Sequence, residues 1–268
     1  MSFKYDRELP LFIAPETRLP IELAGKALDQ CYQSNKSVLV YIHGRAKGVG
    51  EPEKSVESGI YRELAAYGVS VLGFTWDADD AGYDENRPIA SCGDFAKFLS
   101  ALRGYLDTHD VARPALLAHS MGNIIVAESA KDGLLKSDAG NLFSNLVLTS
   151  AAVKTKRHAS WLNTIDAAER LYVSINEHDV VLAFAGFAFH PNMLGRDLQP
   201  PGARSPRVTY MDVSACSVNH RYFVPQGQNK HASLTALYRQ LVTGSAVDFS
   251  GIATYGELNG IGVQRLRG

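Results

Sequence analysis

The chain has 268 residues, of which 46% are hydrophobic and 21% are charged, a composition typical of a globular protein with a sizeable core. Its formal net charge of −1 gives no electrostatic attraction to nucleic acid or to an anionic membrane, so no nucleic-acid partner is expected. The three cysteines, Cys31, Cys92 and Cys216, are widely spaced and form no Cys-x-x-Cys pair. This spacing argues against a disulfide framework and against a zinc site, and we expect no bound metal.

The amino-terminal residues and the apolar runs indicate where in the cell the protein is expected and whether it inserts into a membrane. Residues 1–8 include acidic side chains and lead into no apolar region of the kind found in signal peptides. The longest apolar run, Val180 to Phe189, is about half the length that a bilayer-spanning helix needs. These features predict a cytoplasmic protein without stable membrane insertion.

Short apolar or β-branched runs alternate with segments of helical period along the chain. This alternation is typical of βαβ units, and the near-continuous apolar character of the runs indicates strands covered by helices on both faces. The expected strands are 38–42, 69–75, 115–118, 146–149, 171–175 and 208–213. The expected helices are 21–32, 56–66, 91–106, 122–130 and 234–242. The pattern predicts an α/β fold with three layers and a doubly wound, mostly parallel sheet.

The length fits a single α/β domain covering 1–268, with its core at about 36–244. Residues 1–35 form an amino-terminal extension. Residues 245–268 are rich in glycine and form a carboxyl-terminal extension, for which three structures remain open: a hairpin, an arm onto a partner, or a loose tail. The oligomeric state is also left open by the sequence.

Ser120 lies between the strand 115–118 and the helix 122–130, in the hexapeptide AHSMGN. A serine flanked by small residues two positions away on each side is typical of a nucleophile elbow, a strained turn from strand to helix. The usual pattern is Gly-x-Ser-x-Gly, and Ala118 replaces the first glycine with the smallest side chain available. The pattern indicates that Ser120 is a nucleophile.

A nucleophilic serine needs a histidine to accept its proton, a carboxylate to orient that histidine, and amides that bind the oxyanion. Asp179 comes a few residues after the fifth expected strand and is the predicted acid, with Glu177 as the alternative. His220 follows the last expected strand and is the predicted base. Its competitor is His231, near the start of the final helix.

The pair His43-Gly44 directly follows the first expected strand, where a glycine allows a sharp turn that aims an amide into the site. The main-chain amides of Arg45 and Met121 are the predicted oxyanion hole, and the His43 side chain is expected to be a buried hydrogen-bonding group. The glycine-rich run 44–50 lacks the Gly-Lys-Ser/Thr ending of a phosphate loop, so it does not predict a nucleotide site.

The order Ser, Asp, His with a His-Gly turn upstream resembles the α/β-hydrolase superfamily over about residues 36–244. Within it, the chain is similar to largely uncharacterised bacterial hydrolases of the serine esterase and lipase kind. In these, a strand end such as FTW (74–76), an HSMGN elbow and a His-x-Tyr-Phe sequence near the carboxyl terminus recur. The resemblance implies Ser120 as nucleophile, Asp179 as acid and His220 as base, with no cofactor and with a small-molecule or lipid-like ester as substrate.

We therefore expect a serine hydrolase that cleaves a carboxylic ester through an acyl-enzyme intermediate. The same triad would serve a thioesterase, an amidase or a phospholipase, and a non-catalytic scaffold that binds a ligand is the alternative from another class. The apolar stretch 180–194 is either a wall or lid of the acyl pocket or a core helix. The acidic loop 76–80 lacks the ligand spacing of a metal site and is expected to be solvated.

Overall fold

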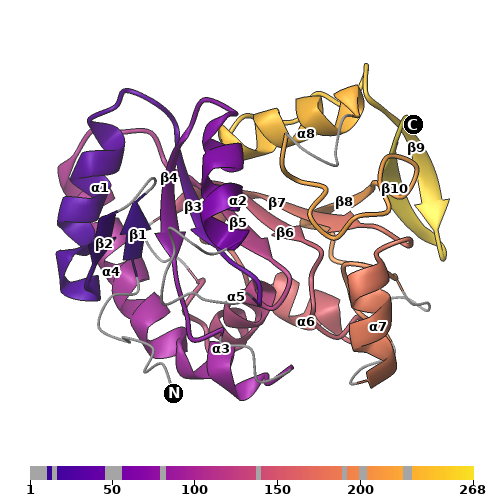
Figure 1. The fold of residues 1–268 in the computed structure, drawn as a ribbon, viewed down its shortest axis with the longest axis horizontal. Coiled ribbons are helices and arrows are strands. Elements are labelled where there is room, and N and C mark those ends of the chain that lie inside the picture. The colour runs from indigo at the N-terminus through magenta and orange to yellow at the C-terminus, as the bar shows by residue number, and fades with distance from the viewer. Residues whose placement is uncertain are drawn as a thin grey trace.

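The computed structural model describes residues 11–13, 17–45, 56–78, 83–136, 140–188, 192–198, 204–225 and 231–268. In this part of the chain ten strands form one sheet in the order β2-β1-β4-β3-β5-β6-β7-β8-β10-β9 (Figure 1). The strands are β1 (Leu11–Ile13), β2 (Thr17–Leu19), β3 (Val38–Ile42), β4 (Ser70–Phe74), β5 (Ala115–His119), β6 (Phe143–Thr149), β7 (Ala168–Ile175), β8 (Val208–Asp212), β9 (Ala253–Leu258) and β10 (Ile261–Leu266). The helices are the 3₁₀ helix η1 (Ile21–Leu23), α1 (Ala24–Tyr32), α2 (Val56–Ala65), α3 (Asn86–Ala90), α4 (Cys92–Thr108), α5 (Gly122–Lys131), α6 (His158–Leu162), α7 (Val180–Ala188) and α8 (Ala232–Val242).

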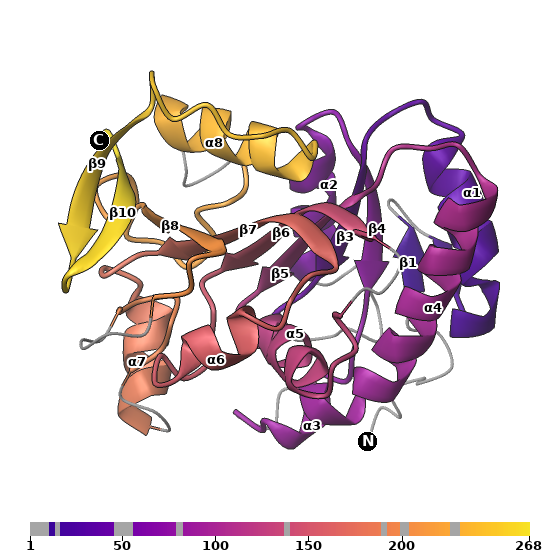
Figure 2. The same cartoon turned by 180° about the vertical axis from the view of Figure 1, so that it is seen from behind.

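The sheet is parallel from β4 through β3, β5, β6, β7 and β8 to β10, and antiparallel pairing occurs at its two ends. Helices cover both faces. The helices α2 and α8 lie on one face, and α1, α4, α5 and α6 lie on the other (Figure 1 and Figure 2). The predicted fold class, a three-layer and mostly parallel α/β fold, is confirmed.

The two faces of each central strand explain why its sequence is apolar throughout. Successive side chains of a strand point to opposite faces. In β3, Val40 and Ile42 pack under the α4 and α5 layer, whereas Leu39 and Tyr41 pack under the α2 and α8 layer. Because both faces are covered, every residue of β3 is buried, and the strand carries no polar position.

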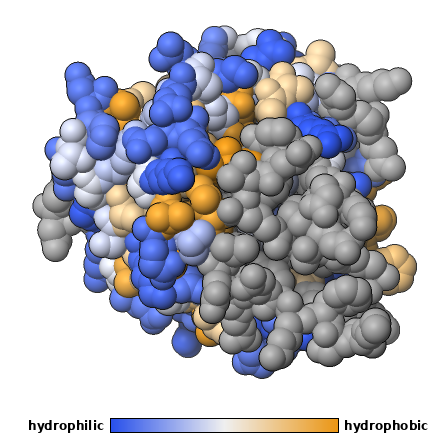
Figure 3. All heavy atoms as spheres, turned by 60° about the vertical axis from the view of Figure 1, so that its left-hand side comes forward, coloured by the Kyte–Doolittle hydropathy of each residue, from blue (hydrophilic) through white to orange (hydrophobic). Residues whose placement is uncertain are grey.

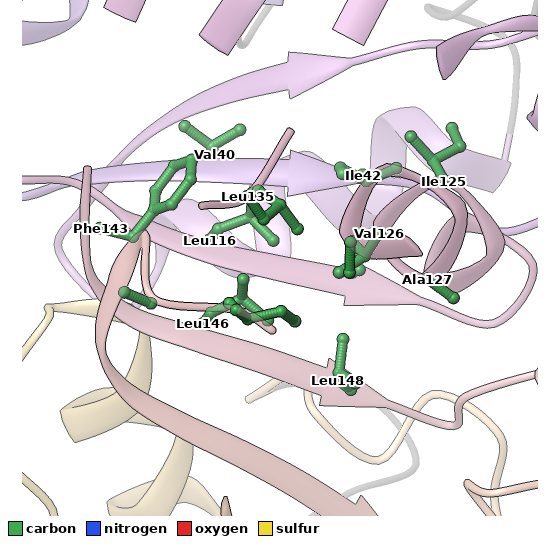
Figure 4. Packing of buried hydrophobic residues seen from close by; sticks show 14 of the residues in the cluster. Val40, Ile42, Leu116, Ile125, Val126, Ala127, Leu135, Phe143, Leu146 and Leu148 are labelled. Atoms are coloured by element: carbon green, nitrogen blue, oxygen red, sulfur yellow. The ribbon is translucent and has the colours of Figure 1, made fainter. Parts of the chain in front are cut away.

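Helix α5 is held firmly against the sheet directly after the predicted elbow. Figure 4 shows Ile125 and Val126 of α5 in the same buried cluster as Ile42, Leu116 and Leu148, which come from β3, β5 and β6. All five side chains are almost completely buried. Burial of each contributes about 1.5–3 kcal/mol. The start of α5, where the predicted nucleophile lies, is therefore fixed by the core.

All six expected strands are present, and the expected helices differ from the observed ones by a few residues at most. Residues 245–268 contain the β9–β10 hairpin, in which β10 pairs in parallel with β8. Of the three structures considered for this extension, the hairpin is the one observed. The short elements β1, β2, α3 and α6 were not expected from the sequence.

In the view of Figure 3, which brings the side with α1 and β2 forward, hydrophilic residues cover most of the coloured surface. Hydrophobic residues form only small areas there (Figure 3). Among the helices of the described residues, none is long and apolar enough to cross a bilayer.

Candidate active site

Ser120 occupies a strained turn at the carboxyl end of β5. Its φ of 52° lies in the left-handed region, which costs energy for a residue with a side chain. Hydrogen bonds from neighbouring segments hold the turn: the Ser120 amide donates to Thr149 O at 3.1 Å, and Asn123 Nδ2 donates to Ser120 O at 2.9 Å. The predicted elbow geometry is therefore present at this serine.

Two glycines allow the backbone to approach Ser120 closely. A Cβ on Gly44 would lie 2.7 Å from Ser120 Cβ, and a Cβ on Gly122 would lie 2.5 Å from His43 O. Carbon atoms cannot approach their neighbours this closely without a shift of the backbone. The requirement for small residues around the elbow thus arises from contact between the β3 and β5 strand ends.

The structure brings the predicted acid and base together. His220 Nδ1 lies 2.8 Å from Asp179 Oδ2 and 3.0 Å from Asp179 Oδ1. The Asp179 side chain is fully buried, and 14% of the His220 side chain is exposed. With Nδ1 donating to the carboxylate, Nε2 of the neutral ring is free of its proton and available as a base.

The Asp179 carboxylate is fixed by the helix that follows it. Asp179 Oδ1 accepts a hydrogen bond from the Leu182 amide at 3.0 Å, so Asp179 caps the amino-terminal end of α7. Asn176 links the acid loop to the base loop, because its Nδ2 donates to Asn219 O at 3.2 Å. These bonds orient the Asp179 carboxylate and fix the position of the loop that carries Asp179 relative to the loop that carries His220.

His220 lies beside the elbow. Its ring centroid is 4.7 Å from that of His119, the residue directly before Ser120. Ser150 Oγ, at the end of the neighbouring strand β6, donates to His220 O at 2.7 Å. Within the described residues Ser120 makes no direct hydrogen bond to His220. Such bonds between nucleophile and base are often long before a substrate is bound.

The peptide between Gly44 and Arg45 is oriented by His43. Trp76 N donates to His43 Nε2 at 3.2 Å, which leaves the proton of the neutral ring on Nδ1, and Nδ1 donates to Gly44 O at 2.7 Å. The His43 ring also stacks on Trp76, with centroids 5.4 Å apart. In a trans peptide the N–H points opposite to the C=O, so the Arg45 amide points away from the His43 ring.

The two main-chain amides predicted to bind the oxyanion have no hydrogen-bond acceptor among the described residues. The amides of Arg45 and Met121 donate no hydrogen bond there. Met121 stands just before α5, where the first amides of a helix have no partner within the helix. Donors that have no acceptor among the described residues and lie beside a strained serine are the arrangement that binds an oxyanion in acyl-transfer enzymes.

A family model described as "Alpha/beta hydrolase of unknown function (DUF900)" matches residues 25–186, which is more than half of the chain. The chain belongs to this α/β-hydrolase family. Among solved structures, a "predicted CIB-like hydrolase from Thermoplasma acidophilum" is similar over 70% of this chain and 78% of its own, with 12% identity and a TM-score of 0.34. A comparison with curated proteins finds no match. The matched family range includes Ser120 and Asp179 and ends before His220.

The alternative acid and base of this α/β hydrolase lie elsewhere. The Glu177 side chain is exposed, and its amide donates to Ser214 Oγ at 2.9 Å. His231 precedes α8, and its buried Nδ1 has no hydrogen-bond partner within the described ranges. Asp179 and His220 are therefore hydrogen-bonded to each other, whereas neither Glu177 nor His231 is bonded to this pair.

The acidic loop 76–80 lies partly outside the described residues. Its Asp77 forms an ion pair with Arg87 at 3.2 Å, and only 20% of the Asp77 side chain is exposed, so this carboxylate is partly buried rather than fully solvated. Across the described ranges, no group of three or more His, Cys, Asp or Glu side chains could hold a metal ion.

The apolar stretch 180–194 is divided between core and surface over its described part: Met193 and Leu194 are buried in the core, whereas α7 is buried on one side only. Helix α7 buries Leu182, but Val180, Val181 and Phe184 are exposed by 54%, 45% and 79%. Such exposure of large apolar side chains directly after Asp179 leaves an apolar face beside the candidate site.

Several residues near the site were missed by the sequence analysis. Asn176 and Ser150 hold the loops that carry the acid and the base. The sequence carried one signal, since Ser150 ends its strand as Ser120 does. A role for Ser150, however, depends on a contact with a residue 70 positions away in the chain.

Proposed function

We propose that this protein is a serine hydrolase that cleaves a carboxylic ester through an acyl-enzyme intermediate. The observation that carries the proposal is the buried Asp179–His220 pair, joined at 2.8 Å and packed beside the strained Ser120. A carboxylate that orients a histidine next to a serine on a sharp turn is the arrangement that activates a hydroxyl for acyl transfer.

The proposed reaction proceeds in two halves. His220 Nε2 takes the proton of Ser120 Oγ as Oγ forms a bond to the acyl carbon, and Asp179 stabilises the resulting imidazolium. The Arg45 and Met121 amides bind the negative oxygen of the tetrahedral intermediate. The bond to the alcohol then breaks, the alcohol takes the proton from His220, and water hydrolyses the acyl-enzyme in the same way.

One feature supports an apolar or lipid-like ester as substrate. The exposed apolar face of α7, with Val180 and Phe184, begins one residue after Asp179. Thioester, amide or phospholipid substrates would use the same triad.

Hydrolysis of p-nitrophenyl esters of increasing acyl length tests the proposal. We expect turnover by the wild type, and a fall in kcat on the order of 10⁴-fold or more for Ser120→Ala and for His220→Ala. Asp179→Asn is expected to lose on the order of 10⁴-fold, because the histidine then takes the wrong tautomer. His231→Ala is the matched control and is expected to keep wild-type turnover.

The outcomes are distinguishable. Loss of turnover in His231→Ala but not in His220→Ala would reverse the choice of base. If α7 contacts the acyl group, Phe184→Ser lowers kcat/KM for long acyl chains and leaves that for acetate unchanged. A wild type that is inactive on every ester would contradict the enzyme proposal and favour a ligand-binding scaffold.

A further inference from the structure

Two neighbouring strands are each followed by a serine whose backbone adopts the left-handed conformation. Ser120 follows β5 with a φ of 52°, and Ser150 follows β6 with a φ of 44°. The last paired residues of these strands, His119 and Thr149, stand opposite each other. The two serines therefore leave the sheet side by side, and both are almost fully buried.

The segment from Ser150 to Ala152 contacts both parts of the candidate site. Ser150 Oγ donates to His220 O at 2.7 Å, and the Ser150 amide donates to Tyr222 Oη at 2.9 Å. Two residues further on, the Ala152 amide donates to Ser120 O at 3.2 Å. One short segment thus holds the backbone of the nucleophile on one side and the backbone of the base on the other.

Beneath Ser150 lies a set of buried hydroxyls. Tyr222 Oη is 2.9 Å from Ser174 Oγ, Tyr238 Oη donates to Ser174 Oγ at 3.0 Å, and Thr149 Oγ1 is 3.0 Å from Tyr238 Oη. Tyr222 Oη thus accepts from the Ser150 amide and lies within hydrogen-bond distance of Ser174 Oγ. Burial raises the pKa of both tyrosines, so they keep their protons.

The conformational cost of Ser150 indicates why a hydroxyl stands there. Glycine adopts a φ near 44° without strain, whereas serine does so at a cost. The main chain after Ser150 is also packed closely against Gly195, because a Cβ on Gly195 would lie 2.1 Å from Ala151 N. The serine offers what glycine cannot, which is the hydrogen bond to His220 O.

We propose that Ser150 is a positioning residue: its hydroxyl fixes the main chain of His220 and so sets the distance between the imidazole and Ser120. The proposal rests on the proposed function and deepens it. Since His220 carries the proton of the reaction, a shift of its loop alters the chemical step, whereas substrate binding is unaffected. A displacement of about 1 Å at a reacting group costs on the order of 10²-fold in rate.

Ser150→Gly is the decisive variant, because it removes the hydroxyl and relieves the backbone strain at once. We expect kcat for a p-nitrophenyl ester to fall by about tenfold or more. We expect KM to change by less than about twofold, and Tm to be unchanged or higher. The matched control is Asn35→Gly, which relieves a similar φ of 54° at an exposed position and is expected to leave kcat unchanged.

The results separate the two proposals. A wild type that turns over the ester, with Ser150→Gly at the same kcat, overturns the role of Ser150 and leaves the proposed function intact. A fall in kcat with a matching fall in Tm assigns Ser150 a structural role only and also overturns the inference. A wild type that hydrolyses no ester overturns the proposed function, and the inference falls with it.

Discussion

Gly44 stands where the end of β3 meets the elbow. A Cβ at this position would lie 2.7 Å from Ser120 Cβ and 3.0 Å from His119 Nδ1. The atoms in the way belong to the elbow itself, which the core holds from both sides. A methyl group at residue 44 therefore has to displace the predicted nucleophile or the neighbouring amide of Arg45.

Gly44→Ala is expected to lower kcat/KM by about 10²-fold, because both Ser120 and the oxyanion amide move. The overpacking is expected to cost about 1–3 kcal/mol in the free energy of unfolding. Gly104→Ala is the control, since a Cβ there meets nothing within 4 Å inside α4. It is expected to stabilise the protein by about 0.5–1 kcal/mol and to leave activity unchanged.

Two buried histidines are expected to make the protein sensitive to acid. Burial holds the pKa of His119 well below its ordinary value, with the neighbouring His220 adding to the effect, and burial also lowers the pKa of His158. In the unfolded chain these imidazoles bind a proton below about pH 6.5, whereas in the folded protein their lowered pKa values mean that they bind it only at lower pH. The unfolded state therefore gains protons first, and stability falls as pH drops below about 6.5.

Urea unfolding at pH 7.5, 6.5 and 5.5 measures this effect. Each histidine is expected to contribute a loss of up to about 1.4 kcal/mol per pH unit below pH 6.5. His119→Gln removes one of the two contributions, so the variant loses less stability between pH 6.5 and 5.5. His178→Gln, which changes an exposed side chain, is expected to keep the wild-type slope.

At the scale of elements, the β9–β10 hairpin extends the sheet beyond β8. Gln264 and Arg265 of β10 pair in parallel with Met211 and Asp212 of β8. The buried side chains on the hairpin face the core; they are Ala253, Leu258, Ile261, Val263 and Leu266. The hairpin also covers the edge of β8, and an uncovered edge would be open to pairing with another chain.

If the hairpin is an integral part of the fold, truncating one of its buried side chains is costly. Leu266→Ala is expected to lower the free energy of unfolding by about 2–5 kcal/mol. Thr254→Ala, at an exposed position of the same hairpin, is expected to stay within about 0.5 kcal/mol of the wild type. Equal stability of the two variants would mean that the hairpin contributes nothing to the fold.

The central strands could be predicted from the sequence, whereas the edge strands could not. Strands buried on both faces, such as β3 and β5, carry unbroken apolar runs that stand out from their surroundings. In β9 only the first and last residues are buried, so its sequence shows no apolar run. The three-residue strands β1 and β2 are too short to show any period.

The same distinction applies to the residues of the site. The candidates Ser120, Asp179 and His220 stand out in the sequence because each follows an apolar strand, and parallel strands bring their carboxyl ends to one edge. Ser150 also follows such a strand, but its role depends on a left-handed backbone and on a contact with a loop 70 residues away. Neither the left-handed backbone nor the distant contact can be predicted from the spacing of nearby residues in the sequence.

At the scale of the whole molecule, the parallel sheet assembles the candidate site from distant parts of the chain. Gly44, Ser120, Ser150 and Asp179 each lie just beyond the carboxyl end of a strand, at β3, β5, β6 and β7. His220 comes from the loop after β8 and reaches back to Asp179. In open α/β sheets this edge is where ligands bind. The family match and the geometry agree on a hydrolase.

The central claim is that Ser120 is an activated nucleophile, and mass spectrometry after treatment with a fluorophosphonate tests it most directly. The serine oxygen displaces fluoride and leaves a stable phosphonyl adduct. We predict one adduct per chain in the wild type, located at Ser120, and none in Ser120→Ala. A wild type that forms no adduct, or an adduct that persists in Ser120→Ala, would contradict the account.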